Sequence, residues 1–207
     1  MKHSKGIEKR GKITRQRNPI MLFAAEGDNR TEEIYFKNYS IRDGLRIIPA
    51  DRIVTDPVNM MKNLLKQAND MDLSVELGDM AFCIVDTDAD RDRQIKIDTA
   101  CSKQTPLVKV ITTTPCFEEW FLCHYRYSTR PQTNDDANKE MEKWYPGYEK
   151  KKNIFSEIQS NTQQAIANAK KLERHHLEDG KKIQSMESNP STEVYKVVEY
   201  ILNSRKK

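Results

Sequence analysis

The sequence has no long hydrophobic run and little apolar material overall. Of its 207 residues, 37% are hydrophobic and 32% are charged, which predicts one compact core covered by polar helices. No stretch reaches the roughly 18 apolar residues that a membrane-spanning helix needs. No hydrophobic segment follows the basic start MKHSKGIEKRGKITRQR, so we expect neither a membrane span nor a secretory signal. The expected location is the cytoplasm.

Cysteine is scarce and lacks the spacing of a metal site. The chain has four cysteines and no CxxC pair, which favours buried, reduced cysteines of a cytosolic protein. Cys116, Cys123 and His124 leave a weak zinc site open. The motif GxxxxGK[ST] is also missing, and this absence excludes ATP hydrolysis by the P-loop route.

Positive charge is concentrated at the start of the chain. The formal net charge is +4, and residues 1–18 hold seven basic residues against one acid, 7 − 1 = +6, so the remainder carries 4 − 6 = −2. A basic arm suits binding to the phosphate backbone of nucleic acid, because each neutralised phosphate releases counterions. A solubilising tail is the alternative. The candidate nucleic-acid-binding residues are Lys9, Arg10, Lys12, Arg15 and Arg17.

Short apolar runs alternate with amphipathic segments up to residue 128. The runs predict strands at 20–26, 45–49, 80–86 and 107–113, and the intervening patterns predict helices from Thr31, from Pro57, over about 91–102 and from Pro115. Such alternation implies right-handed crossovers and a mainly parallel four-stranded sheet flanked by helices, which is an α/β, Rossmann-like fold.

The rest of the chain is predicted to be helical. We expect helices at roughly 135–145, 153–178 with a break near Asn161, and 191–204 with Ser191 or Thr192 as its cap. His175 and His176 are expected on a helix surface. The expected organisation is a basic, flexible arm over 1–18, an α/β domain over 19–128 and a helical C-terminal region over 129–207 that packs on it.

Acidic residues follow two of the predicted strands. Glu26 ends the first run, and Asp86 and Asp88 end the third. Ligands of open parallel sheets bind beyond the carboxyl ends of the strands, and clustered carboxylates repel one another unless a cation neutralises them. Oxygen ligands suit Mg²⁺ or Mn²⁺, which can activate water for phosphodiester hydrolysis. The alternative is a solvated loop whose acids pair with Arg91 and Arg93.

Four ordered segments resemble the successive motifs of one protein family. They are FAAEGDNRTEEIYF (23–36), FCIVDTDAD (82–90), TPCFEEWFLCHY (114–125) and NPSTEVYKVVEY (189–200). Together they resemble the RloB family over roughly residues 15–200. That family is predicted to carry a Toprim domain and is associated with prokaryotic phage-defence and restriction loci. The resemblance therefore implies a Toprim-like fold.

The resemblance also implies roles for particular residues. Toprim domains are Mg²⁺-binding folds shared by topoisomerases, bacterial primases and the overcoming-lysogenization-defect nucleases. In them a strand-end glutamate acts as acid or base and a DxD pair holds metal, which assigns these roles to Glu26 and to Asp86 with Asp88. Three residues separate Gly27 from Thr31 where the family is expected to have two, and this leaves the position of Glu32 open. Further candidate metal ligands are Glu32 and Asp90, and further candidate contacts to metal or substrate are Glu118, Lys151 and Lys152.

These features predict a Mg²⁺- or Mn²⁺-dependent nuclease that acts on DNA or RNA as an effector of prokaryotic phage defence. The alternative is a non-catalytic module of a defence system that binds metal together with nucleic acid or a partner protein. Nucleotidyl transfer, as in primases, is a weaker third option. Nucleic acid is the expected partner, and an activating defence protein and a homo-oligomer are compatible with the sequence. The choice of DNA or RNA and the number of metal ions are left open.

Overall fold

A five-stranded sheet forms the centre of the fold, with strand order β2-β1-β3-β4-β5. The computed structural model describes residues 17–26, 31–39, 44–51, 55–88 and 90–204. The first four strands pair in parallel, and β5 pairs antiparallel with β4. The strands are β1 (Ile20–Ala24), β2 (Arg46–Pro49), β3 (Met80–Asp86), β4 (Val108–Thr114) and β5 (Ser191–Thr192).

Helices connect the strands and continue beyond them. Pro57 opens α2, and the Asp56 side chain caps this helix by accepting hydrogen bonds from the backbone N–H groups of Val58 and Asn59. The α-helices are α1 (Thr31–Lys37), α2 (Pro57–Asp70), α3 (Arg91–Cys101), α4 (Glu118–Leu122), α5 (Asn134–Trp144), α6 (Phe155–Ile158), α7 (Thr162–Glu178) and α8 (Val194–Ser204). Two short 3₁₀ helices are η1 (Val75–Leu77) and η2 (Gln159–Asn161).

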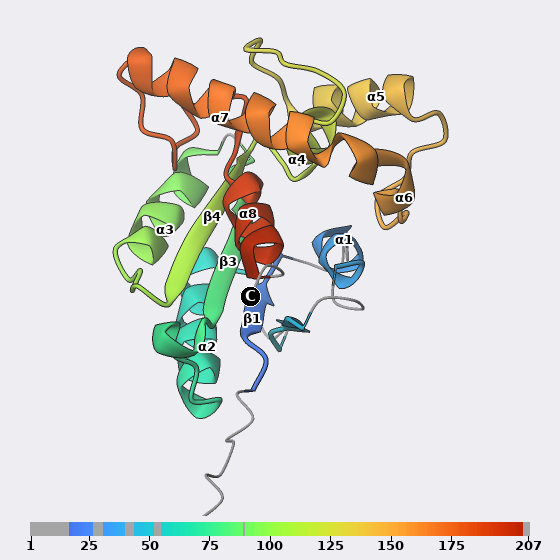
Figure 1. Cartoon of the computed structure of the whole chain (residues 1–207). Helices are drawn as coiled ribbons and strands as arrows, with labels where there is room; N and C mark the ends of the chain where they lie inside the picture. The colour runs from blue at the N-terminus through green and yellow to red at the C-terminus, as the bar shows by residue number, and fades with distance from the viewer. Residues whose placement is uncertain (1–16, 27–30, 40–43, 52–54, 89, 205–207) are drawn as a thin grey trace, which may run out of the picture.

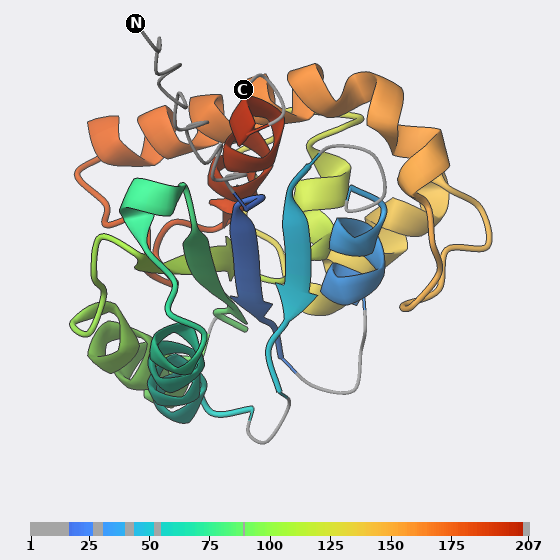
Figure 2. The same cartoon turned by 60° about the horizontal axis from the view of Figure 1, so that its bottom comes forward.

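The helices cover both faces of the sheet (Figures 1 and 2). Alternate residues of a strand point to opposite faces, so Phe23 and Phe82 enter one core while Leu22 and Cys83 enter the other. Helices α2 and α3 complete the core around Leu22, and α1, α4 and α8 contribute to the core around Phe23. Helix α7 runs across the top of Figure 1, beyond one end of the sheet.

The predicted α/β class and mainly parallel sheet are confirmed, and β3 has the predicted bounds. The prediction of four strands is wrong, because Ser191 and Thr192, expected as a helix cap, form the fifth. Two residues are too few to produce a strand pattern in the sequence. The expected surface position of His176 is also wrong, because the side chain is buried with its Nε2 atom 2.8 Å from the Pro190 carbonyl oxygen. The Toprim-like assignment stays a prediction.

The four cysteines carry free thiols, and three of them are buried. In the part of the chain that the structure describes, Cys116, Cys123 and His124 do not form a metal site. No helix within the described ranges combines the length and the apolar character needed to cross a bilayer.

Arg17 has a structural partner at the start of β1. Its guanidinium contacts the fully buried carboxylate of Asp79 at 2.9 and 2.5 Å. Asp79 also accepts hydrogen bonds from the backbone N–H groups of Ile20 and Ser74, so the pair joins the beginning of β1 to the segment before β3. Arg17 was expected in a nucleic-acid-binding arm, and the other four candidates, Lys9, Arg10, Lys12 and Arg15, lie outside the described residues.

Candidate functional site

The strand order creates a natural binding crevice between β1 and β3. From β1 the chain passes to β2 on one side and then to β3 on the other, so the connections that leave these two central strands diverge. Ligands of open α/β sheets bind at such a switch point, beyond the carboxyl ends of the strands. Glu26 follows β1, Asp86 is the last residue of β3, and Asp88 follows it.

These three acids line one cavity of about 220 Å³. Helix α1 adds Glu32, α4 adds Glu118, and α5 adds Asn134 at its first position. Five of the lining residues are carboxylates. Within the described part of the chain, the lining is Glu26, Thr31, Glu32, Thr55, Asp86, Asp88, Phe117, Glu118, Asn134 and Lys150.

Asp86 is held against the neighbouring strand. Its carboxylate accepts a short hydrogen bond from the hydroxyl of Thr113, the residue opposite it in β4. Burial raises the pKa of Asp86 to about 7, the Thr113 bond acts in the opposite direction, and the nearby Glu118 raises the pKa further. This carboxyl group is therefore expected to be partly protonated at neutral pH.

The Asp88 side chain is positioned by a turn in the backbone. Asp88 has a positive φ of 50°, a conformation that Asp tolerates better than most residues. Its backbone N–H donates to the Pro115 carbonyl at 3.1 Å, and its carboxylate accepts a 2.8 Å hydrogen bond from the Asn134 amide. The turn thus directs the second acid of the DxD pair toward the start of α5.

Arg93 supplies an internal counter-charge to the site. This residue of α3 forms an ion pair with Glu26 and lies 3.1 Å from an Asp88 carboxylate oxygen, and its Nε atom donates to the Asp86 carbonyl at 2.6 Å. The sequence left open that acids of the DxD loop pair with Arg91 and Arg93. The structure shows such a pair between Asp88 and Arg93. Even so, burial raises the pKa of Glu26 to about 8, against the lowering effect of Arg93, and Asp86 raises it further.

Two more buried glutamates complete the acidic wall. Glu32 is 7% exposed, and one of its carboxylate oxygens, Oε2, has no hydrogen-bond partner among the described residues. Burial and the adjacent Asp86 raise the pKa of Glu32 well above its ordinary value. Glu118 is 2% exposed and accepts a 3.0 Å hydrogen bond from the Tyr148 hydroxyl.

The cation in the cavity lining is Lys150, the neighbour of the two lysines expected there. Burial opposes the charged form of Lys150, but Glu118 and the other nearby acids raise its pKa. The Lys151 backbone N–H donates to the Thr31 hydroxyl at 3.3 Å. The Lys152 ammonium donates to the Gly147 carbonyl at 2.9 Å and lies over the Tyr145 ring. Neither Lys151 nor Lys152 lines the cavity.

Asp90 lies outside the cavity lining and has a structural role. Its side chain caps α3 by accepting a 2.8 Å hydrogen bond from the backbone N–H of Arg93. Aspartate at this position is a common N-cap. The third acid of DTDAD therefore sets the start of α3, the helix that carries Arg93.

The residues present fit a hard divalent cation in their chemistry. Five carboxylates face two cations, Arg93 and Lys150, which gives −5 + 2 = −3 if all are ionised. Two of the buried carboxylate oxygens, Glu26 Oε1 and Glu32 Oε2, have no hydrogen-bond partner, and oxygen donors of this kind suit Mg²⁺ or Mn²⁺. Within the described ranges, however, no three His, Cys, Asp or Glu side chains are arranged to hold an ion as they stand.

Several residues of the site could not be assigned from the sequence. Asn134 and Thr113 are common polar residues, and only the fold brings them to Asp88 and Asp86. Lys150 is adjacent to the two predicted contacts, Lys151 and Lys152, and no sequence signal distinguishes among three consecutive lysines. Arg93 was included in the alternative prediction, in which the acids of the DxD loop pair with arginines. The signal for it was its position shortly after these acids in the sequence.

The comparison with family models gives one match. A model described as RloB-like protein matches residues 21–201, which is most of the chain. No curated protein and no solved structure matches the chain.

Proposed function

The chain belongs to the RloB-like protein family, and from this premise we propose that it is a Mg²⁺- or Mn²⁺-dependent nuclease that hydrolyses phosphodiester bonds. The observation that carries the proposal is the excess of carboxylates around one cavity at the switch point of the sheet. Burying like charges together is costly unless a cation compensates them. A cluster of buried carboxylates is therefore not expected to stabilise the fold by itself.

In this proposal each side chain has a definite task. Asp86, Asp88 and Glu32 would hold the ion, which when bound supplies charge stabilisation at the phosphate and a more acidic water. Glu26, with its pKa raised to about 8, can carry a proton at neutral pH and exchange it with an attacking or leaving oxygen. Lys150 places a positive charge in the cavity lining, where it can contact a substrate phosphate.

The nuclease proposal is tested by incubating the purified protein with plasmid, single-stranded DNA and tRNA in Mg²⁺ or Mn²⁺. Glu26→Gln, which removes the acid–base group, and Asp86→Asn, which removes a metal ligand, are each expected to lower cleavage by about a hundredfold or more. Asp98→Asn is the matched control, because Asp98 is a half-exposed acid of α3 that pairs with Lys182. If the wild type cuts none of these substrates, or the two site variants cut as well as the control, the nuclease proposal is wrong for them.

A second candidate is a module that binds metal and nucleic acid without cutting. One observation favours it: Arg93 already neutralises part of the acidic charge at Glu26 and Asp88. On this alternative, deleting residues 1–16, which leaves the Arg17 pair with Asp79 intact, should weaken nucleic-acid binding steeply at low salt. Glu26→Gln should change binding little. If the chain that lacks residues 1–16 binds nucleic acid as strongly as the full chain, the proposal of a non-catalytic binding module is contradicted.

The proposal for the cellular role rests on the family resemblance. The association of this family with phage-defence loci leads us to propose that the nuclease is a defence effector. Cells that express the wild-type chain with its neighbouring genes should survive phage challenge better than cells that express Glu26→Gln. Equal survival at equal protein levels would show that nuclease activity is not needed for defence.

A further inference from the structure

A second cavity, of about 410 Å³, lies along α5 and the loop that precedes it. Its helical wall is formed by Asp136, Lys139, Glu140 and Lys143. Asp136 is followed three and four residues later by Lys139 and Glu140, and Lys143 follows these two after four and three residues, so the four positions share one face of the helix. The loop contributes Ser128, Arg130, Pro131 and Gln132. Nothing in the proposed reaction uses this cavity.

The two acids of the second cavity have partners within the protein. Asp136 accepts hydrogen bonds from the backbone N–H and the hydroxyl of Thr133 in a capping box. Glu140 receives two charge-assisted hydrogen bonds from Arg126, at 2.6 and 2.8 Å. Both carboxylates are therefore engaged with the protein itself.

The three cations of the second cavity are in a different situation. The side chains of Arg130, Lys139 and Lys143 are exposed, and across the described ranges they make no hydrogen bond or ion pair. Asp136 attracts Arg130 and Lys139 electrostatically, and the described lining carries three cations against two carboxylates, 3 − 2 = +1, so part of this positive charge is balanced by counter-ions from solvent. Release of such counter-ions is the main driving force for binding a phosphate backbone.

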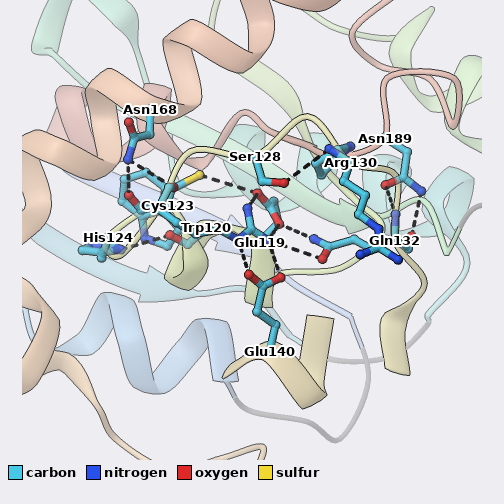
Figure 3. A network of polar contacts seen from close by, with 12 residues as sticks. Glu119, Trp120, Cys123, His124, Ser128, Arg130, Gln132, Glu140, Asn168 and Asn189 are labelled. Carbon is cyan, nitrogen blue, oxygen red and sulfur yellow. Dashed lines mark hydrogen bonds and ion pairs between the residues drawn. The ribbon is translucent and has the colours of Figure 1, made fainter. Parts of the chain in front are cut away.

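The floor of the cavity is fixed by a buried polar network (Figure 3). Gln132 is 8% exposed and its amide donates to the fully buried Glu119. Asn189 holds the Gln132 backbone on both sides, with hydrogen bonds of 3.1 and 2.8 Å. Arg126 lies between the carboxylates of Glu119 and Glu140. The loop that carries Arg130 is thus anchored at Gln132, and this preorganises the cavity.

An aromatic side chain lies at the far end of the same helix. Trp144, the last residue of α5, is 47% exposed. Its ring stacks on Tyr125 with 5.3 Å between centroids and 15° between planes. Exposed aromatic rings beside a cationic groove are the usual elements of single-strand binding, because unpaired bases stack on them.

Helix α5 also connects this cavity to the acidic one. Its first residue, Asn134, lines the acidic cavity and binds Asp88, while Lys139 and Lys143 line the second. From Asn134 to Lys143 the helix rises about 13 Å, which matches about four nucleotides at the 3.4 Å spacing of a stacked strand.

We propose that the cavity along α5 binds the backbone of single-stranded nucleic acid and leads that strand toward the acidic cavity. This inference rests on the proposed function and specifies the form of its substrate. A single strand fits because a base that stacks on Trp144 must be unpaired.

The proposal is tested by binding of fluorescein-labelled 15-mers of thymidine and uridine in EDTA, where no metal-dependent cleavage can occur. The Lys139→Gln/Lys143→Gln variant should lose about 1.4 units of slope in a plot of log affinity against log salt, at about 0.7 per contact. Between about 50 and about 200 mM salt, the wild type should therefore lose about sevenfold more affinity than this variant. Trp144→Leu should weaken binding roughly tenfold and abolish the quenching of tryptophan fluorescence by the oligonucleotide.

The matched control is Lys62→Gln/Lys66→Gln, two exposed lysines at the same spacing on α2. The proposal is overturned if the α5 variant keeps the wild-type salt slope, or if the control loses as much. Equal competition by a 15-bp duplex or by polyglutamate would also overturn it. Thermal melting of each variant checks that it is folded. Normal binding in EDTA without cleavage in Mg²⁺ would refute the nuclease proposal and leave this inference intact.

Discussion

Replacing Glu26 by glutamine should change how the stability of the metal-free protein depends on pH. The pKa of Glu26 is raised from 4.5 to about 8, chiefly by burial. The folded state therefore binds a proton at Glu26 that the unfolded state has released, over the range between these two values. The stabilisation from this proton is fully present below the unfolded pKa, and it is lost as the pH rises through the folded pKa.

The size of this effect follows from the two pKa values. Between about pH 5.5 and about pH 7.5, Glu26 alone should reduce the free energy of unfolding by about 2.5 kcal/mol. Glutamine does not titrate, so Glu26→Gln should lack this loss. Titrating groups remote from Glu26, such as His176, are present in both proteins and their contributions cancel in the comparison.

Urea denaturation in EDTA at the two pH values measures the difference directly. Asp98→Asn serves as the control, because the Lys182 pair lowers the pKa of Asp98 and this group is ionised in both states over the range. Saturating Mg²⁺ should restore stability to the wild type at the higher pH and have less effect at the lower pH, where the carboxyl is protonated. If wild type and Glu26→Gln lose the same stability, the argument that burial keeps a proton on Glu26 near neutral pH is wrong.

Two further predictions concern the ion pairs of the fold. Arg93→Gln removes the internal counter-charge of Glu26 and Asp88. It should therefore strengthen Mg²⁺ binding, measured by calorimetry, about tenfold, a gain of about 1.4 kcal/mol. An unchanged Mg²⁺ affinity would show that Arg93 and the ion do not compete. Asp79→Asn leaves the Arg17 charge unpaired beside a buried amide. It should therefore lower the free energy of unfolding, measured by urea denaturation, by about 2 to 3 kcal/mol. A loss of stability no larger than that of Asp98→Asn would contradict the importance of the Arg17 pair.

Much of the fold could be predicted because β1, β3 and β4 are buried on both faces. The run MAFCIVD gave the bounds of β3, and the alternation of strands and helices gave the parallel sheet. The pairing of Ser191 and Thr192 with β4 depends on contacts between residues about eighty positions apart. Such a pairing leaves no periodic signal in a two-residue segment.

Of the candidate site, only the acidic residues at the strand ends could be predicted, because the other residues are brought there by contacts that leave no local sequence pattern. The position of Glu26, Asp86 and Asp88 after strands follows from local sequence and the rule for parallel sheets. Whether Lys150 or Lys151 lines the cavity depends on the backbone of one turn, where Lys151 takes a positive φ of 76°. No composition or spacing rule specifies that turn, because lysine is not typical of this conformation.

The charge of the acidic cavity constrains the order in which ligands can enter it. A phosphodiester brings a further negative charge toward five carboxylates, which among the described residues are offset by Arg93 and Lys150. The raised pKa values of Glu26 and Asp86 mean that the metal-free cavity reduces its charge by taking up protons. A divalent cation achieves the same neutralisation and also attracts the phosphate. Substrate binding inside this cavity should therefore be weak without metal, so the affinity measured in EDTA should come from the surfaces outside it.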